Sequence, residues 1–180
     1  KARHYDSFDA RFGVSSKSDN DTYFMYDIKA GYSFAEDNSE SRGIGAYLGE
    51  HLFNINATVG QVLERKHNVL FDVGLDLASY SHKDFGSTAA RFHIVPHYVF
   101  SGKRWSVDAG LRISAMLRSE TAGQLFPTKD QMVYPDVKAW FDVIPDAMRL
   151  YSYIGGGSRL NTYNSLLMEN HHFDPSFGQG

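Results

Sequence analysis

Apolar and polar residues alternate with a period of two along most of the chain. The pattern is clear over residues 23–34, where Phe24, Tyr26 and Ile28 begin an apolar row and Asp27 lies in the polar row. Successive side chains of a β-strand point to opposite faces of the sheet, so this period indicates strands with one apolar and one polar face. The alternation is regular in six segments, at residues 5–16, 23–34, 68–79, 88–100, 105–116 and 132–143.

Two further segments are less regular. The apolar parity slips within residues 43–60, which predicts a β-bulge near His51. Residues 149–156 form a short segment that ends in glycine. Pro96 lies inside a regular segment and predicts another local bulge, because proline has no N–H for a strand ladder. Together the segments predict an all-β fold with about eight strands.

The connections between these segments are predicted to differ in length on the two sides of the sheet. Counted from the first, the odd ones are tight, at residues 17–21, 61–66, 101–104 and 144–147. The even ones are longer, at residues 35–42, 80–86 and 117–131, and residues 157–180 follow the eighth segment. Short turns on one side and long loops on the other are typical of outer-membrane barrels.

Glycines in the middle of the predicted strands indicate which face lies inside. Gly13, Gly31, Gly74 and Gly110 all fall in the polar row. Glycine weakens a solvent-facing strand, whereas inside a narrow barrel it makes room for large neighbours. We therefore expect the polar face inside and the apolar face against lipid, in an antiparallel up-and-down transmembrane β-barrel. The eight visible strands form a closed barrel or part of a larger one.

A polar inner face makes its charged and histidine side chains the candidates for lining a lumen. These lumen-facing candidates are Asp27, Lys29, Asp72, Asp76, Arg91, His93, Asp108, Arg112, Asp136 and Lys138. Their mixed signs suit pairing across a crowded interior. An ordinary solvated face, as on a soluble lipocalin-like ligand-binding barrel, remains the alternative interpretation.

Composition narrows the function further. The net charge of −3 gives no basic field for nucleic acid, and the absence of cysteine excludes disulfides and thiol catalysis. No run approaches the roughly 20 apolar residues of a spanning helix. The 14% aromatic content and the 16 glycines fit β structure. The chain begins at Lys1, and we expect it to be processed or cut from something longer.

No catalytic, cofactor or metal site is predicted. His93 and His97 share a strand face about 13 Å apart, too far for both to ligate one metal. The pair His171-His172 with Asp174 is a better chelating composition, but it lies in a loop-like tail. A rim set for lipid-modifying chemistry would have to come from Ser79, His82, Ser87 and His93, and their spacing fixes no geometry. We therefore expect a protein that is not an enzyme and has no cofactor.

The chain reads as a single domain, with barrel strands over residues 1–156 and a long loop or tail over residues 157–180. Its C-terminal part, residues 132–180, resembles barrel domains of TonB-dependent receptors. The residues that carry the resemblance are Tyr134-Pro135-Asp136-Val137, Val143-Ile144-Pro145, Tyr151-Ser152-Tyr153-Ile154-Gly155-Gly156-Gly157, Asn161-Thr162-Tyr163-Asn164-Ser165-Leu166-Leu167 and Glu169-Asn170.

The resemblance implies a location in the bacterial outer membrane and uptake of a ligand through a plugged barrel. The partners would be outer-membrane lipid, a TonB-type energising protein and a plug domain outside this chain. Two features depart from the pattern: the 180 residues contain no plug, and they end in Gly180 rather than in an aromatic residue. A porin-like passive pore and a small closed structural or lipid-modifying outer-membrane barrel remain alternatives.

Overall fold

The computed structural model describes residues 5–16, 24–37, 48–63, 66–82, 85–119, 126–162, 165 and 169. Eight strands follow one another in this part of the chain: β1 (Tyr5–Ser15), β2 (Phe24–Asp37), β3 (Leu48–Leu63), β4 (His67–His82), β5 (Phe85–Ser101), β6 (Trp105–Ser119), β7 (Phe126–Ile144) and β8 (Met148–Gly155). The predicted eight strands and the all-β class are confirmed.

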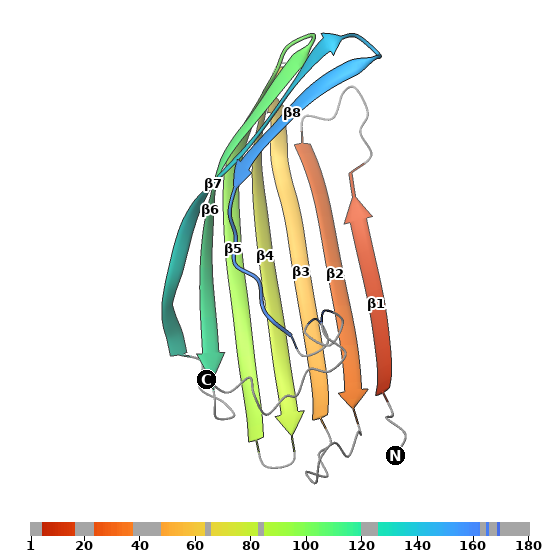
Figure 1. Cartoon of the computed structure of the whole chain (residues 1–180), viewed down its shortest axis with the longest axis vertical. Helices are drawn as coiled ribbons and strands as arrows, with labels where there is room; N and C mark the ends of the chain where they lie inside the picture. Colours follow the sequence, from red (N-terminus) through yellow and green to blue (C-terminus); the bar gives the residue numbers. More distant parts are fainter. Residues whose placement is uncertain are drawn as a thin grey trace.

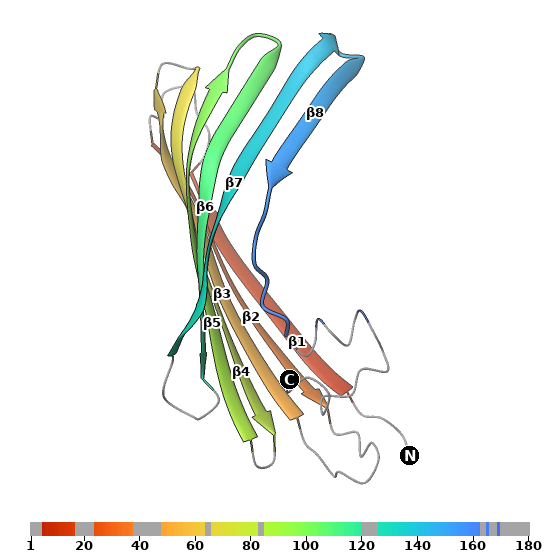
Figure 2. The same ribbon diagram turned by 60° about the vertical axis from the view of Figure 1, so that its left-hand side comes forward.

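The strands form one antiparallel sheet in sequence order, from β1 to β8 (Figure 1). Each strand pairs with the next one along the chain, as in an up-and-down meander. Among the described residues, β1 and β8 do not pair with each other, and Figure 2 shows β8 standing away from β1. The sheet is therefore open and has two free edges, so the closed form of the predicted barrel is not observed.

Five strands, β2 and β4 to β7, are longer than the alternation alone predicted. β4 has 16 residues, β5 has 17 and β7 has 19. Sixteen residues at about 3.3 Å are roughly 53 Å long, and a tilt of about 40° reduces their height to about 40 Å. This height exceeds the hydrocarbon layer of about 30 Å, so such strands would extend beyond it at their ends.

Strand extension also changes the predicted sorting of the connections. Only residues 83–84 separate β4 from β5, because most of the loop predicted at residues 80–86 belongs to the two strands. Eight residues, 16–23, separate β1 from β2, which is as many as in the long loop predicted at residues 35–42. The expectation of short turns on one side and long loops on the other is therefore wrong at these two connections.

The bulge predicted near His51 is absent. β3 pairs without a break from Leu48 to Leu63 with β4, and equally regularly with β2. The parity slip arises because Leu48, an apolar residue, lies buried in the polar row. The residue type within this row therefore changes from apolar to polar along β3, while the backbone pairing stays regular. Ile44 and Ala46, which helped to suggest the slip, lie outside the described residues.

Pro96 does not produce a bulge either. Its pairing with Phe71 continues the ladder between β4 and β5. The ladder between β5 and β6 omits Val95 and Pro96 and then resumes at His97 in the same register. The missing proline N–H therefore interrupts pairing without shifting it. Register shifts occur elsewhere, between Ala115 and Leu117 and between Asp142 and Ile144.

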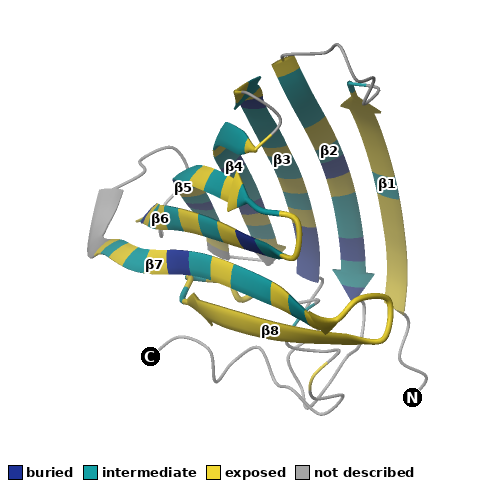
Figure 3. Cartoon of the chain, turned by 90° about the horizontal axis from the view of Figure 1, so that it is seen from above, coloured by how far each residue is buried: buried dark blue, intermediate teal, exposed yellow. Residues whose placement is uncertain are grey.

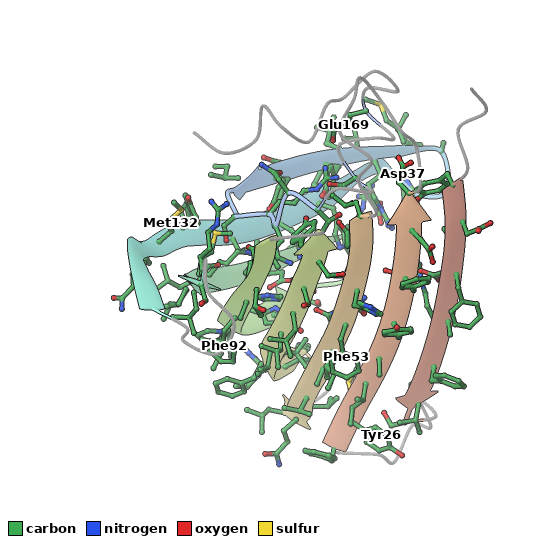
Figure 4. All side chains as sticks on the ribbon, turned by 90° about the horizontal axis from the view of Figure 1, so that it is seen from below. Tyr26, Asp37, Phe53, Phe92, Met132 and Glu169 are labelled. Carbon is green, nitrogen blue, oxygen red and sulfur yellow. The ribbon has the colours of Figure 1, made fainter. Side chains whose placement is uncertain are left out.

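The register separates an apolar face from a polar face over the whole sheet. Phe53, Phe71, Phe92 and Leu111 lie on the apolar face, which Figure 4 shows for Phe53 and Phe92. These four side chains from the inner strands β3 to β6 are 38–46% exposed. The reverse holds on the polar face, where carboxylates are buried; Figure 3 shows buried segments in β2, β3 and β7.

The polar face is the inner face of the curved sheet. After β8, residues 156–162, here called the strap, run back over this face (Figures 1 and 2). Gly157 lies beside Arg112 of β6, Ser158 contacts Arg91 of β5, and Asn161 contacts Tyr80 of β4. The strap therefore spans the hollow side of the sheet from β8 to β4.

Candidate functional site: a charged network on the polar face

All ten residues predicted to line a lumen lie on one face of the sheet. The pairs Asp76 with Arg91, Gly74 with His93, and Asp108 with Lys138 place neighbouring strands in phase. Asp27, Lys29, Asp72, Arg112 and Asp136 follow on the same face through the continuous register. The local alternation predicted this shared face, and the cross-strand pairing decides which of the ten side chains meet.

Glycines on this face leave room for the larger side chains of the next strand. A Cβ atom at Gly74 would overlap the imidazole ring of His93, its partner on β5. A Cβ at Gly31 would lie 2.7 Å from Asn54 Oδ1, and one at Gly110 would lie 2.7 Å from His97 Cβ. These distances are shorter than real Cβ contacts. Gly74 and Gly110 therefore leave room that the present packing of the polar face uses, whereas at Gly31 only the end of the Asn54 side chain would have to move.

The centre of the face is a chain of polar side chains that runs across four strands. Thr58 of β3 donates a hydrogen bond of 2.6 Å to Asp72 of β4. The imidazole of His97 on β5 lies between Asp72 and Asp108 of β6, with Nε2 3.4 Å from Asp72 and Nδ1 2.8 Å from Asp108. The His97 side chain is only 9% exposed, so water screens these contacts weakly.

The chain continues from β6 into β7. Lys138 Nζ lies 4.0 Å from Asp108 Oδ2 and 3.7 Å from Asp136 Oδ1. Arg112 donates to the other oxygen of Asp136 through Nη2 at 2.7 Å, and the Asp136 side chain is 5% exposed. A carboxylate this deeply buried needs its two cations nearby, because an unpaired buried charge is costly. The network thus joins β3 to β7 by side-chain contacts.

A second ion pair holds the strap. Arg91 donates from Nε to Asp76 Oδ2 at 2.8 Å, and its Nη2 contacts the same oxygen. Its Nη1 donates to the carbonyl oxygen of Ser158 in the strap. The Tyr80 hydroxyl donates to the carbonyl of Asn161 at 3.2 Å. The strap backbone is thus fastened to the polar face by donors from β4 and β5.

Three of the ten predicted residues take part neither in the central network nor in the fastening of the strap. Lys29 and Asp27 form an ion pair of 2.7 Å along β2, and both side chains are exposed. His93 covers Gly74, but its Nδ1 is buried without a hydrogen-bond partner among the described residues. The list of candidates omits Thr58 and His97 of the network, and Tyr80 and Ser158, which take part in the strap contacts. His97 had a local signal, because it shares the parity of His93.

The metal set and the rim set considered from the sequence can be compared with the described part of the sheet. In the described residues, no group of three or more His, Asp or Glu side chains is placed to hold a metal ion. The register puts Ser79 on the apolar face and both Ser87 and His93 on the polar face, so that rim set does not assemble. His171, His172 and Asp174 lie outside the described residues. The carboxylates and cations of the network instead neutralise one another.

No family model matches the chain, and no curated protein matches its sequence. Within the described residues, no helix combines the length and hydropathy that a membrane-spanning helix requires.

Proposed function

We propose that this chain forms part of the wall of a bacterial outer-membrane β-barrel that takes up a ligand, with the architecture of a TonB-dependent receptor barrel. The observation that carries the proposal is the inverted burial of the sheet. Large apolar side chains at mid-sheet are well exposed on the outer face, while Asp136 is buried on the inner face. Soluble domains normally do the opposite, since buried carboxylates and broad exposed apolar faces are both unfavourable in water.

The same inversion argues against a lipocalin-like soluble barrel. That fold puts its apolar face inside and its charges in water. Here the strap and the charge network both lie on the inner side. An outer-membrane barrel has this polarity, with an apolar band facing lipid and a polar interior.

The open edges favour a barrel with more than eight strands. In an eight-strand barrel β1 would pair with β8, and side chains would fill the interior. These two strands are unpaired with each other, and their side chains are almost all exposed. Additional strands at both edges would satisfy the free backbone groups, which lipid cannot do. A wider barrel also leaves a lumen for transport.

An aromatic cluster supports an interface with lipid at the end of the sheet where β5 turns into β6. Phe100 packs edge-on against Trp105, with ring centroids 4.9 Å apart, and stacks on His67 at 4.6 Å. All three lie on the apolar face, beside the exposed Lys103 and Arg104 of the turn. Aromatic rings at the boundary between an apolar band and charged groups are typical of membrane interfaces.

The two tryptophans test membrane insertion. Trp105 lies on the apolar face, and Trp140 lies on the polar face with the Arg149 guanidinium 4.1 Å from its ring centroid. Single-tryptophan variants, W105F and W140F, would be reconstituted in lipid brominated near the headgroup end of its acyl chains. We expect strong fluorescence quenching of Trp105 and little of Trp140. Equal quenching, or a protein that stays in water with neither quenched, would contradict the proposal.

Ion flux tests the transport part. If the polar face lines a pathway, K138E should raise the preference for K⁺ over Cl⁻ in planar bilayers, with K103E in the exposed β5–β6 turn as a control off that face. The whole protein would be measured beside R91A, in which the strap loses a donor. A protein that inserts into the bilayer but never conducts ions, even as R91A, would refute the transport role. The proposal that the chain is part of a membrane barrel wall would still hold.

A further inference from the structure

His97 stands at the weakest point of the β5–β6 ladder. Val95 and Pro96 make no pair with β6, and pairing resumes where His97 meets Gly110. Proline cannot donate to a neighbouring strand, so at least one backbone hydrogen bond is missing here. Gly110 lets the His97 side chain pack closely, because a Cβ there would lie 2.7 Å from His97 Cβ. A side-chain contact at this position reinforces the interrupted β5–β6 ladder, here called the β5–β6 seam.

The imidazole of His97 is placed between two acceptors. Asp108 Oδ1 is 2.8 Å from Nδ1 and Asp72 Oδ2 is 3.4 Å from Nε2. Nε2 is buried and makes no hydrogen bond among the described residues, so its 3.4 Å contact with Asp72 is an ion-pair contact rather than a hydrogen bond. Ionised carboxylates only accept hydrogen bonds, and a neutral imidazole carries a single N–H. Only the imidazolium form presents a proton to both carboxylates at once.

The charges around His97 also favour its imidazolium form. The groups that face it or its partners from neighbouring strands are Asp72 with Thr58 on one side, and Asp108 with Lys138 on the other. The connected network continues through Asp136 to Arg112. Asp72, Asp108 and Asp136 supply three negative charges, and Lys138 and Arg112 supply two positive ones. A proton on His97 balances the network.

We propose that His97 is a proton-operated tie between strands: its imidazolium joins Asp72 of β4 to Asp108 of β6 across the interrupted β5–β6 seam. Loss of the proton leaves one ring nitrogen facing a carboxylate with no hydrogen between them, and gives the network a net negative charge. The seam is then held only by its remaining backbone pairs. The tie belongs to the sheet itself and operates whether or not the barrel transports a ligand.

¹⁵N NMR of the histidine rings shows directly which ring nitrogens carry a proton. The whole protein, labelled with ¹⁵N-histidine and held in detergent micelles, would be compared with H97Q to assign the resonances of His97. We expect both ring nitrogens of His97 to be protonated at pH 7. D108N and D72N should each lower the protonated fraction at that pH. A ring nitrogen of His97 without a proton in the wild type at pH 7 would overturn the proposal.

Hydrogen exchange tests the mechanical role at one fixed pH. The backbone amides of Asp108 and Gly110 on β6 should exchange several-fold faster in H97Q than in the wild type. The matched control is H93Q, which changes the same residue type on the same face of β5, four positions away. Equal exchange in H97Q and the wild type, or an equal acceleration in H93Q, would mean that His97 does not tie the seam.

Discussion

Gly74 on β4 and His93 on β5 are cross-strand partners, and the His93 ring fills the space that any side chain at position 74 would need. We predict that G74A destabilises the protein by about 1–3 kcal/mol, because overpacking forces the ring and the backbone to shift. The free energy of unfolding in urea gives the measurement.

Position 13 offers a matched control on the same face. A Cβ at Gly13 would lie 3.5 Å from Lys29 Cγ, an ordinary contact. G13A should therefore change stability little. Adding H93A to G74A should recover part of the loss, since the obstructing ring is gone. Equal effects of G74A and G13A would contradict this account of the polar-face glycines.

Buried and exposed carboxylates of the polar face should respond differently to neutralisation. D136N leaves Arg112 and Lys138 without their shared carboxylate in a buried setting, and should cost about 3–5 kcal/mol. D27N removes the partner of Lys29, where both side chains are exposed, and should cost less than about 1 kcal/mol. Urea unfolding of both variants at one salt concentration measures the two losses in the free energy of unfolding. If D136N were as mild as D27N, the network would be an ordinary solvated surface.

The fastening of the strap predicts its susceptibility to protease. R91A removes the donor to the Ser158 carbonyl, and should therefore speed tryptic cleavage after Arg159 several-fold. Y80F removes one weaker hydrogen bond, to Asn161, and should have a smaller effect. Mass spectrometry of timed digests would follow the cleavage. R11A, on the exposed strand β1, provides the control, and cleavage after Arg159 at the same rate in R91A and R11A would disprove the fastening.

If the outer face contacts lipid, an arginine placed on it should cost more stability near the middle of the membrane than near its surface. Leu111 lies near the middle of β6 and is 46% exposed, whereas Val143 lies close to the β7–β8 turn. In a membrane, L111R should cost about 2–4 kcal/mol and V143R about 0–1 kcal/mol. In water, arginine at an exposed site changes stability by less than about 0.5 kcal/mol. Unfolding from lipid vesicles distinguishes these cases, and two equally mild variants would count against the membrane interpretation.

The sequence by itself determined where most strands run and which residues share a face. Alternation is a local property, because two neighbouring side chains on a strand must point in opposite directions. The segment at residues 105–116, for example, lies wholly within β6, Trp105–Ser119. The same local rule failed at His51 and Pro96, where a change in residue type or a missing N–H left the register intact.

Only the tertiary structure decided which side chains meet, where the strap lies and that the sheet stays open. His97 touches Asp72 and Asp108, which are 25 and 11 positions away, because strand pairing brings β4 and β6 to either side of β5. Contacts between strands depend on a register that many backbone hydrogen bonds fix together, and no single segment encodes it. The alternation therefore indicated a polar face, while cross-strand pairing turned that face into a network.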